Sequence, residues 1–245
     1  MKNTIAIIPA RWNSSRFPGK SIVDILGVPM IVRVWTQVRK CQNINKILVA
    51  TDDERISNVC KKFNIDFVMT GSDYNTGTDR VASLVEEYSY NTYVNVQGDE
   101  PLVNPKDIDT LVSFHLEGVT KGIEVTNGYV PYSKLPEKYN EIKSYLAKND
   151  DDLIVNISRS PIISDLKNKN SEFLSHIGMY AFTKGALMRF VSWTKGTLEK
   201  SESIEMLRFI ENKEKIRCLS LGSGSIAVDY PKDVEKVENI LKGRF

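Results

Sequence analysis

The chain has 245 residues, and 41% of them are hydrophobic, which is enough for the core of one large α/β domain. Lysine and arginine total 33 against 31 acidic residues, so the formal net charge of +2 gives no overall field that would attract nucleic acid or an anionic membrane. An anion-binding site in this protein must therefore be local.

The first predicted element is an apolar strand over residues 4–8, and a loop with three cations follows it directly. Arg11, Arg16 and Lys20 can each neutralise phosphate oxygens, and Ser14 adds a hydroxyl donor. Open α/β sheets bind ligands at the carboxyl ends of their strands, which is where this loop lies. We therefore predict a polyphosphate site; a surface loop with solvated charges is the alternative.

Beyond this loop, short β-rich runs alternate with longer segments of helical period, as in βαβ units. The predicted strands cover residues 46–50, 66–69 and 92–96, and the predicted helices start at Pro29 and cover residues 53–63, 80–88 and 105–116. This order predicts a largely parallel sheet with helices on both faces.

A glycine turn leads into the third of these helices at residues 76–80. Free backbone amides at a helix start, together with Arg80, could bind a base edge or a phosphate. Capping of the helix by Thr78 or Asp79 is the structural alternative.

Two aspartates stand at positions that suit a magnesium ion. Asp99 follows the strand at residues 92–96, next to Gly98, whose lack of a side chain permits close approach of a ligand. Asp229 follows a short apolar run and precedes a helix that begins at Pro231. Magnesium commonly uses one or two carboxylates plus substrate phosphates, so this pair suits a nucleoside triphosphate site. Capping of a helix or turn by each aspartate is the alternative.

After Gly118 the alternation loosens. We predict a single domain over residues 1–245, in which an insertion of about residues 118–176 carries part of a substrate wall or a dimer contact. Within it we expect a strand at 122–130, a turn at 131–136, a solvated acidic turn at 150–152 and an apolar strand at 153–157. Regular alternation returns with a strand at 177–182, a helix from residue 184, a helix near 202–211, a strand at 215–221 and a last helix after residue 231.

Two further residues are candidates for binding an acid. Arg159 follows one apolar strand and His176 precedes another. The bidentate fork of an arginine suits a carboxylate, and a histidine can donate to the same group. The other histidine, His115, lies on a predicted helix and is expected to be ordinary helix surface or core.

The cysteine pattern and the N-terminal sequence indicate the cellular compartment. Cys41, Cys60 and Cys218 are far apart and show no C-x-x-C spacing, which argues against a zinc site or a redox pair and favours buried free thiols. The N-terminus shows no signal-peptide pattern, and no apolar run approaches transmembrane length. We therefore expect a cytoplasmic protein.

Taken in order, these motifs resemble the 3-deoxy-manno-octulosonate (Kdo) cytidylyltransferases, or CMP-Kdo synthetases, within the wider group of sugar-acid cytidylyltransferases. The resemblance covers nearly the whole chain and is weak only from about residue 118 to 152. The matching segments are residues 8–20, 27–32, 49–55, 69–70, 77–80, 95–101, 158–162, 176–181, 191–193 and 228–233.

The resemblance implies a three-layer nucleotidyltransferase fold with a mostly parallel central sheet, and a homodimeric enzyme that joins CTP to a sugar acid with release of pyrophosphate for surface polysaccharide, either lipopolysaccharide or capsule. It implies Mg2+ held by Asp99 and Asp229, which with Arg11 and Lys20 form the catalytic set. The implied nucleotide-binding residues are Pro9, Ala10, Arg11, Ser14, Arg16, Lys20, Thr78 and Arg80, and the implied acid-binding residues are Gln97, Arg159, His176 and Glu205.

Two departures from the family pattern concern the acceptor. Met206 stands where the family usually has a glutamine that would contact the sugar, and residues 156–157 replace an aromatic pair. Because a site matched to a hydroxyl discriminates strongly against its absence, the substrate could be Kdo, an 8-amino or deoxy variant, another 2-keto-3-deoxy acid or a phosphonate.

Other classes of function remain as alternatives. A non-catalytic nucleotide-binding regulator on the same fold is one of them, because a fold does not fix a function. A nicotinamide-dependent oxidoreductase and a P-loop enzyme are disfavoured, because neither G-x-G-x-x-G nor G-x-x-x-x-G-K-[ST] occurs.

Overall fold

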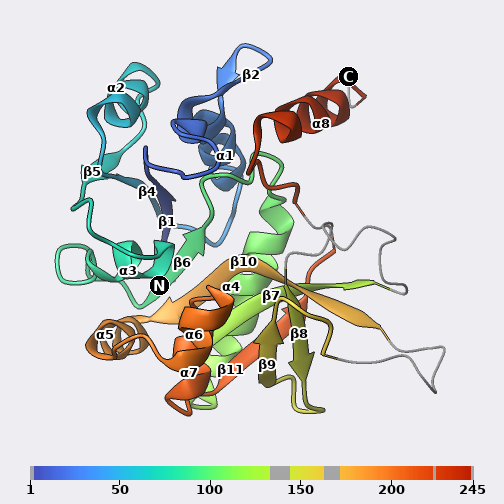
Figure 1. Ribbon diagram of the computed structural model, residues 1–245. Coiled ribbons are helices and arrows are strands. Elements are labelled where there is room, and N and C mark those ends of the chain that lie inside the picture. Colours follow the sequence, from blue (N-terminus) through green and yellow to red (C-terminus); the bar gives the residue numbers. More distant parts are fainter. Residues whose placement is uncertain (1–2, 133–143, 163–171, 223–224, 244–245) are drawn as a thin grey trace.

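The computed structural model describes residues 3–132, 144–162, 172–222 and 225–243 (Figure 1). Within these ranges nine strands form one sheet: β1 (Thr4–Ala10), β4 (Lys46–Thr51), β5 (Phe67–Met69), β6 (Thr92–Val96), β7 (Val125–Tyr132), β8 (Tyr145–Lys148), β9 (Ile154–Ser158), β10 (Phe173–Thr183) and β11 (Ile216–Ser220). Their order is β11-β7-β10-β6-β1-β4-β5, and β8 pairs with β10 and β9. A separate small hairpin joins β2 (Asp24–Ile25) and β3 (Val28–Pro29).

Strands β5, β4, β1 and β6 are parallel to one another, and β10 runs against them. β1 pairs in parallel with β4 and β6, β4 with β5, and β7 with β11, whereas β10 is antiparallel to both β6 and β7. Alternate residues of β1 enter two different cores: Ile5 and Ile7 face one, and Ala6 and Ile8 face the other. A strand apolar on both sides is typical of a sheet covered on both faces, so the predicted layering is confirmed.

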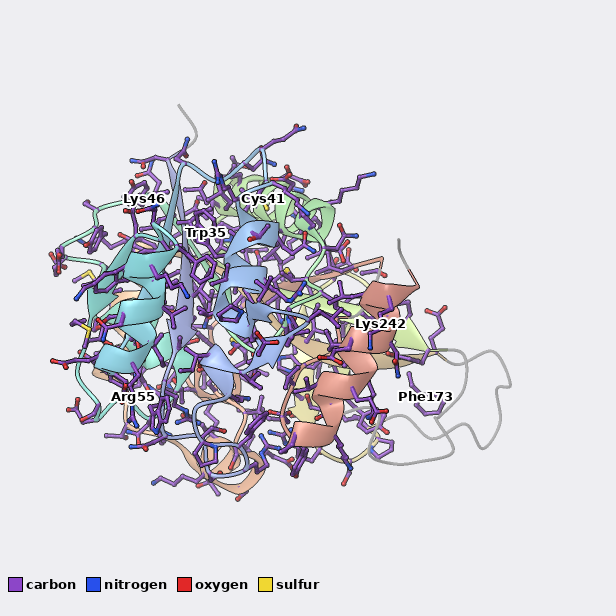
Figure 2. All side chains as sticks on the ribbon, turned by 90° about the horizontal axis from the view of Figure 1, so that it is seen from above. Trp35, Cys41, Lys46, Arg55, Phe173 and Lys242 are labelled. Carbon is purple, nitrogen blue, oxygen red and sulfur yellow. The ribbon has the colours of Figure 1, made fainter. Side chains whose placement is uncertain are left out.

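The helices form the two outer layers. One face carries α1 (Met30–Val38), α2 (Glu54–Lys62) and α4 (Pro105–Thr120), and the other carries α3 (Gly77–Ala82), α5 (Lys184–Ser192) and α7 (Leu207–Glu211). Two views place α1 between α2 and α8 (Pro231–Lys242), which packs with the β2–β3 hairpin through a small core around Ile25, Met30 and Val237 (Figures 1 and 2). None of the helices within the described ranges is long and apolar enough to cross a membrane.

Most of the predicted elements are confirmed, with boundaries that local chemistry explains. α1 begins directly after Pro29, whose fixed φ suits a helix entry. α2 begins after Asp53, whose carboxylate accepts a hydrogen bond from the backbone N–H of Arg55. His115 is fully buried on α4, and residues 149–152 form the turn between β8 and β9.

Two predicted helices are wrong in extent. The helix predicted for residues 80–88 is α3, which starts at Gly77 because the Thr76 hydroxyl accepts from the N–H of Asp79, and it ends at Ala82. The helix predicted for residues 202–211 is split, because Ser203 has a positive φ of 53° that ends α6 (Thr197–Glu202). The turn predicted for residues 131–136 is wrong at residues 131–132, which belong to β7, and its other residues, 133–136, lie outside the described ranges.

The cysteines are free thiols, as expected. Cys60 and Cys218 are buried and Cys41 is partly buried. Burial raises the pKa of Cys60 to about 11 and the pKa of Cys41 and Cys218 to about 12, so all three remain protonated at neutral pH.

Candidate functional site

A cleft of about 180 Å³ opens where the carboxyl ends of β1 and β6 meet the N-terminus of α3. Parallel strands that end at one edge of a sheet bring their following loops together, which is why residues far apart in the sequence line one cavity. Its lining includes most of the residues that the sequence assigned to a nucleotide and a metal: Pro9, Ala10, Arg11, Ser14, Arg16, Lys20, Arg80, Asp99 and Asp229, together with Gln97.

Lys20 lies at the centre of the charged groups in this cleft. Its Nζ donates to Asp99 Oδ2 at 2.6 Å and to Asp229 Oδ1 at 3.1 Å, and also to the carbonyl oxygen of Val228 at 3.2 Å. The side chain is 13% exposed. Burial alone would lower the pKa of Lys20, but attraction by the two carboxylates outweighs it and raises the pKa, so the ammonium stays charged at neutral pH.

Two arginines extend the positive charge toward solvent. Arg16 donates to Asp229 Oδ1 at 3.2 Å and lies 5.4 Å from the centre of the Tyr230 ring, while half of its side chain stays exposed. Burial opposes the charged form of Arg16, but Tyr230 and Asp229 raise its pKa. Arg11 is exposed at the lining of the cleft. The cleft therefore offers solvent-facing guanidinium groups to an anionic ligand.

Gly98 lets the two strand ends approach each other closely. A Cβ atom at this position would lie 2.6 Å from the carbonyl oxygen of Pro9, a distance that side chains do not adopt. The backbones after β1 and β6 can therefore meet in the cleft only because residue 98 is glycine.

The N-terminus of α3 forms the opposite wall, and hydrogen bonds to neighbouring elements fix its residues. Arg80 is almost fully buried, donating to Asp52 Oδ2 at 2.8 Å and to the hydroxyl of Thr70. Thr78 is fully buried: its N–H donates to Glu205 Oε2 at 3.0 Å, and its hydroxyl accepts from a buried asparagine of β6. Among these residues Arg80 reaches the cleft, whereas Thr78 and Glu205 are absent from its lining.

Of the residues predicted to bind an acid, Gln97 lines the cleft, whereas His176 on β10 and Arg159 after β9 are outside its lining. His176 Nδ1 is 3.0 Å from Ser144 Oγ, and its Nε2 is 3.5 Å from the hydroxyl of Tyr180. Burial, with the nearby charge of Arg159, lowers the pKa of His176 to about 3, so the imidazole is neutral at physiological pH. Arg159 is exposed, and its guanidinium donates to the backbone carbonyls of Glu202 and Ser203.

The sequence analysis missed Tyr74 and Asn75, which line the cleft, and also residues that support it. Asp52 ties the opposite walls together, because one of its oxygens pairs with Arg80 while the other accepts from the backbone N–H of Trp12 at 3.4 Å. Tyr180 is buried with its ring stacked on His176 at 5.8 Å. Asp52 follows a strand and lies in the matching segment 49–55, and Tyr180 lies in the matching segment 176–181, but neither position indicated which contact the side chain makes.

Asp99 and Asp229 fit a magnesium ion. Both are hard carboxylate donors, and both already contact one cation, the Lys20 ammonium, so they lie close enough to share another. Clusters of three or more His, Cys, Asp or Glu side chains are absent from the described ranges, so further ligands would come from substrate phosphates and water.

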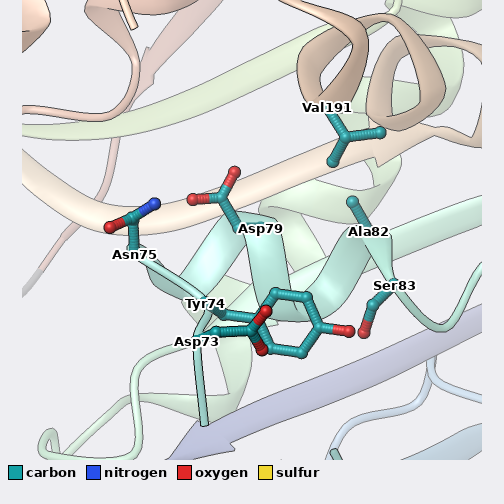
Figure 3. Close-up of a pocket in the computed structure, with 7 residues that line it drawn as sticks. All are labelled: Asp73, Tyr74, Asn75, Asp79, Ala82, Ser83 and Val191. Carbon is teal, nitrogen blue, oxygen red and sulfur yellow. The ribbon is translucent and has the colours of Figure 1, made fainter. Parts of the chain in front are cut away.

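A second pocket, of about 340 Å³, lies between the loop that precedes α3, the helix α3 and the end of α5 (Figure 3). It shares Tyr74 and Asn75 with the cleft and is otherwise lined by Asp73, Asp79, Ala82, Ser83 and Val191. Although it is the larger cavity, it lacks a basic side chain in its lining, and the Asp79 carboxylate is already bonded by Arg208 and Thr76. The chemistry of an anionic substrate therefore belongs to the smaller cleft.

The chain is similar to known nucleotidyltransferases over its whole length. The sequence model of a family described as cytidylyltransferase matches residues 5–216. The 3-deoxy-manno-octulosonate cytidylyltransferase of Chlorobaculum tepidum is 34% identical over 249 residues, with 99% of each chain covered, and that of Geobacter sulfurreducens is 35% identical, with 98% of this chain and 100% of the relative covered. A solved structure of CMP:2-keto-3-deoxy-manno-octonic acid synthetase with CTP superimposes with a TM-score of 0.91 at 28% identity, covering 99% of this chain and 100% of that one.

Proposed function

This chain belongs to the cytidylyltransferase family, and from that premise we propose that it transfers CMP from CTP to 3-deoxy-manno-octulosonate with release of pyrophosphate. The observation that supports it most is the cleft at the carboxyl ends of β1 and β6, where four cations and two carboxylates converge in a chain that aligns from end to end with a CTP-bound synthetase.

In this proposal the protein acts by positioning and by neutralising charge. The anomeric hydroxyl oxygen of the acid bonds to the α-phosphorus of CTP, its proton leaves to solvent, and the bond from that phosphorus to the bridging oxygen of the β-phosphate breaks. Arg11, Arg16 and Lys20 bind the triphosphate and stabilise the negative charge that grows on pyrophosphate. Asp99 and Asp229 would hold magnesium, which when bound withdraws charge from phosphate oxygens.

We assign the acid to the surface next to β10. Arg159 supplies a cation and Gln97 an amide. The neutral ring of His176, with Nδ1 accepting from the Ser144 hydroxyl, can donate its Nε2–H to the carboxylate or a hydroxyl. Glu205 is better suited to hold the Thr78 amide than to bind substrate, because its carboxylate already accepts from that N–H.

The identity of the acceptor acid is the most specific part of the proposal. Met206, at the position where the family usually carries a polar contact, is fully buried in the core that also contains Tyr180 and Phe182. It offers no hydrogen bond to the acceptor. A related acid, such as the 8-amino analogue, another 2-keto-3-deoxy acid or a phosphonate, is therefore the second candidate.

The test is magnesium-dependent pyrophosphate release from CTP with each of these acids, with ATP and UTP as control nucleotides. We expect turnover with CTP and Kdo, and its loss in the variants Asp99→Asn and Asp229→Asn. Turnover with a different acid alone would change the assigned substrate and leave the proposed mechanism unchanged. CTP binding without turnover on any acid would contradict the proposal and favour a nucleotide-binding regulator.

We further propose that the enzyme is a homodimer in the cytoplasm and supplies an activated sugar for surface polysaccharide. Tyr132 and Val155, on the strands of the insertion, are exposed hydrophobic residues suited to a contact between two copies. Two parts of the insertion, residues 133–143 and 163–171, lie outside the described residues. Light scattering during size exclusion would give the mass of one chain if the dimer proposal is wrong.

A further inference from the structure

β10 carries two extra residues beside the acid-binding surface. Between two paired positions it advances four residues, from His176 to Tyr180, while β7 advances only two, from Tyr129 to Asn127. Extra residues in one strand of an antiparallel pair form a bulge, and their backbone groups are left out of the ladder. The carbonyls in this bulge therefore need donors from elsewhere.

The bulge explains how His176 and Tyr180 come together. In a regular strand, residues four apart are separated by about 13 Å. Here the centres of the two rings lie 5.8 Å apart with an angle of 27° between their planes. The strand is shortened by its bulge, and the two side chains stack as a result.

The same bulge leaves space for Gln97. A Cβ atom at Gly178 would lie 2.8 Å from Gln97 Cγ, so the glutamine side chain rests directly on the bulged backbone. Gln97 lines the cleft. Three of the side chains around the acid site thus depend on the shape of one short segment, residues 177–179.

Asn127 binds that segment from the neighbouring strand. It is fully buried, and its Nδ2 lies 2.9 Å from the carbonyl oxygen of Ile177, 3.2 Å from that of Met179 and 3.1 Å from that of Gly128. Two of these carbonyls belong to the bulge. An amide group carries two protons on one short side chain, which suits it to bind two carbonyls of an interrupted strand.

We propose that Asn127 is a positioning residue for the acid half of the site: by bonding the carbonyls of Ile177 and Met179 it fixes the bulge that stacks His176 on Tyr180 and seats Gln97. The inference rests on the proposed function only in assigning these side chains to the acid. Asn127 itself is fully buried and is absent from the lining of the cleft.

The kinetic test compares two buried polar residues on the same strand. Asn127→Leu keeps the number and branching of the side-chain heavy atoms and removes both donors, so we expect the KM for the acid to rise ~10-fold, the worth of about one buried hydrogen bond, with less than about a twofold change in the KM for CTP. The matched control is Thr126→Val, which removes one buried hydrogen bond at the neighbouring position, where Thr126 Oγ1 is 3.0 Å from His115 Nδ1. It should lower the melting temperature and leave both KM values unchanged. Equal rises in both KM values for Asn127→Leu would overturn the inference.

A second readout does not depend on turnover. The chain has only two histidines, so imidazole nitrogen NMR signals can be assigned with one variant. Asn127→Leu should shift the signals of His176 and leave those of His115, and Thr126→Val should do the reverse. If the wild type transfers no CMP, the proposed function fails, but this experiment still decides the role of Asn127. Unmoved His176 signals in Asn127→Leu, or in the milder Asn127→Ser if the first variant does not fold, would overturn it.

Discussion

Among single residues, Lys20 contacts both carboxylates that are predicted to hold the metal. The pair Asp99 and Asp229 is largely buried, with 23% and 9% of the side chains exposed. Two carboxylates close together repel each other, and the ammonium offsets that repulsion. Lys20 thus helps to keep the two carboxylates of the cleft in place.

The variant Lys20→Met tests this role. Without the ammonium we expect the free energy of unfolding to fall by ~2 kcal/mol, less than for a fully buried pair because the site is partly solvated. Magnesium should restore part of that loss, and it should raise the stability of the variant more than that of the wild type. Urea unfolding with and without magnesium measures both effects.

Lys46→Met is the matched control for this measurement. Lys46 also pairs with an aspartate, Asp66 at 2.5 Å, but that aspartate is 65% exposed and far from the cleft. Loss of such a surface pair should change the stability by less than about 1 kcal/mol and leave the magnesium response unchanged. An equal response to magnesium in Lys20→Met and the wild type would show that Lys20 does not shield the two carboxylates.

At the scale of elements, the short helix α3 depends on the segment that leads into α7. The N–H of Thr78 donates to Glu205, and the carboxylate of Asp79 accepts from Arg208 at 2.9 Å. Arg208 is itself fixed by two bonds of 2.7 Å to Glu199. α3 has only 6 residues, which is too short to be stable alone, so these contacts hold the wall of the cleft in place.

Variants of Glu205 separate a supporting role from direct binding of the acid. Glu205→Ala leaves the buried Thr78 N–H without its acceptor, and we expect a loss of about 1–3 kcal/mol in stability with a rise in the KM for CTP. Glu205→Gln keeps an accepting oxygen and should recover most of both. Steady-state kinetics with each substrate varied in turn would decide: a rise in the KM for the acid alone in Glu205→Gln would instead place Glu205 on the substrate.

The elements also show what the sequence could and could not predict. The start of α1 at Pro29 and the cations of the loop after β1 depend on neighbours in the chain, so local pattern was enough. The pairing of Arg80 with Asp52 joins residues 28 positions apart, and the stacking of His176 on Tyr180 depends on a bulge. Neither contact produces a periodic pattern in the sequence. The split between α6 and α7 was missed because the positive φ of Ser203 occurs at a residue that does not require it.

At the scale of the whole molecule, the two histidines link folding to pH. Burial lowers the pKa of His115 to about 4 and, with the charge of Arg159, that of His176 to about 3, both far below the ordinary value near 6.5. In the unfolded chain both would protonate below pH 6.5, so the unfolded state binds more protons than the folded state as the pH falls. The stability that the two neutral histidines contribute is fully present above pH 6.5. It is lost progressively as the pH falls from 6.5 toward their pKa values in the folded state.

We therefore expect the free energy of unfolding to fall as the pH is lowered from 6.5 to 5, by up to about 1.4 kcal/mol per pH unit for each histidine. Glu205 opposes this trend, because burial raises its pKa and the folded state takes up a proton there first. Urea unfolding at pH 7, 6.5, 5.75 and 5 gives the slope and stays above the range where the carboxylates with lowered pKa titrate. His115→Gln removes one of the two histidines and should roughly halve the slope, whatever its effect on stability at pH 7. A wild-type slope near zero, or the same slope in His115→Gln, would mean that the folded protein accepts these protons and that the imidazoles are not held neutral by burial.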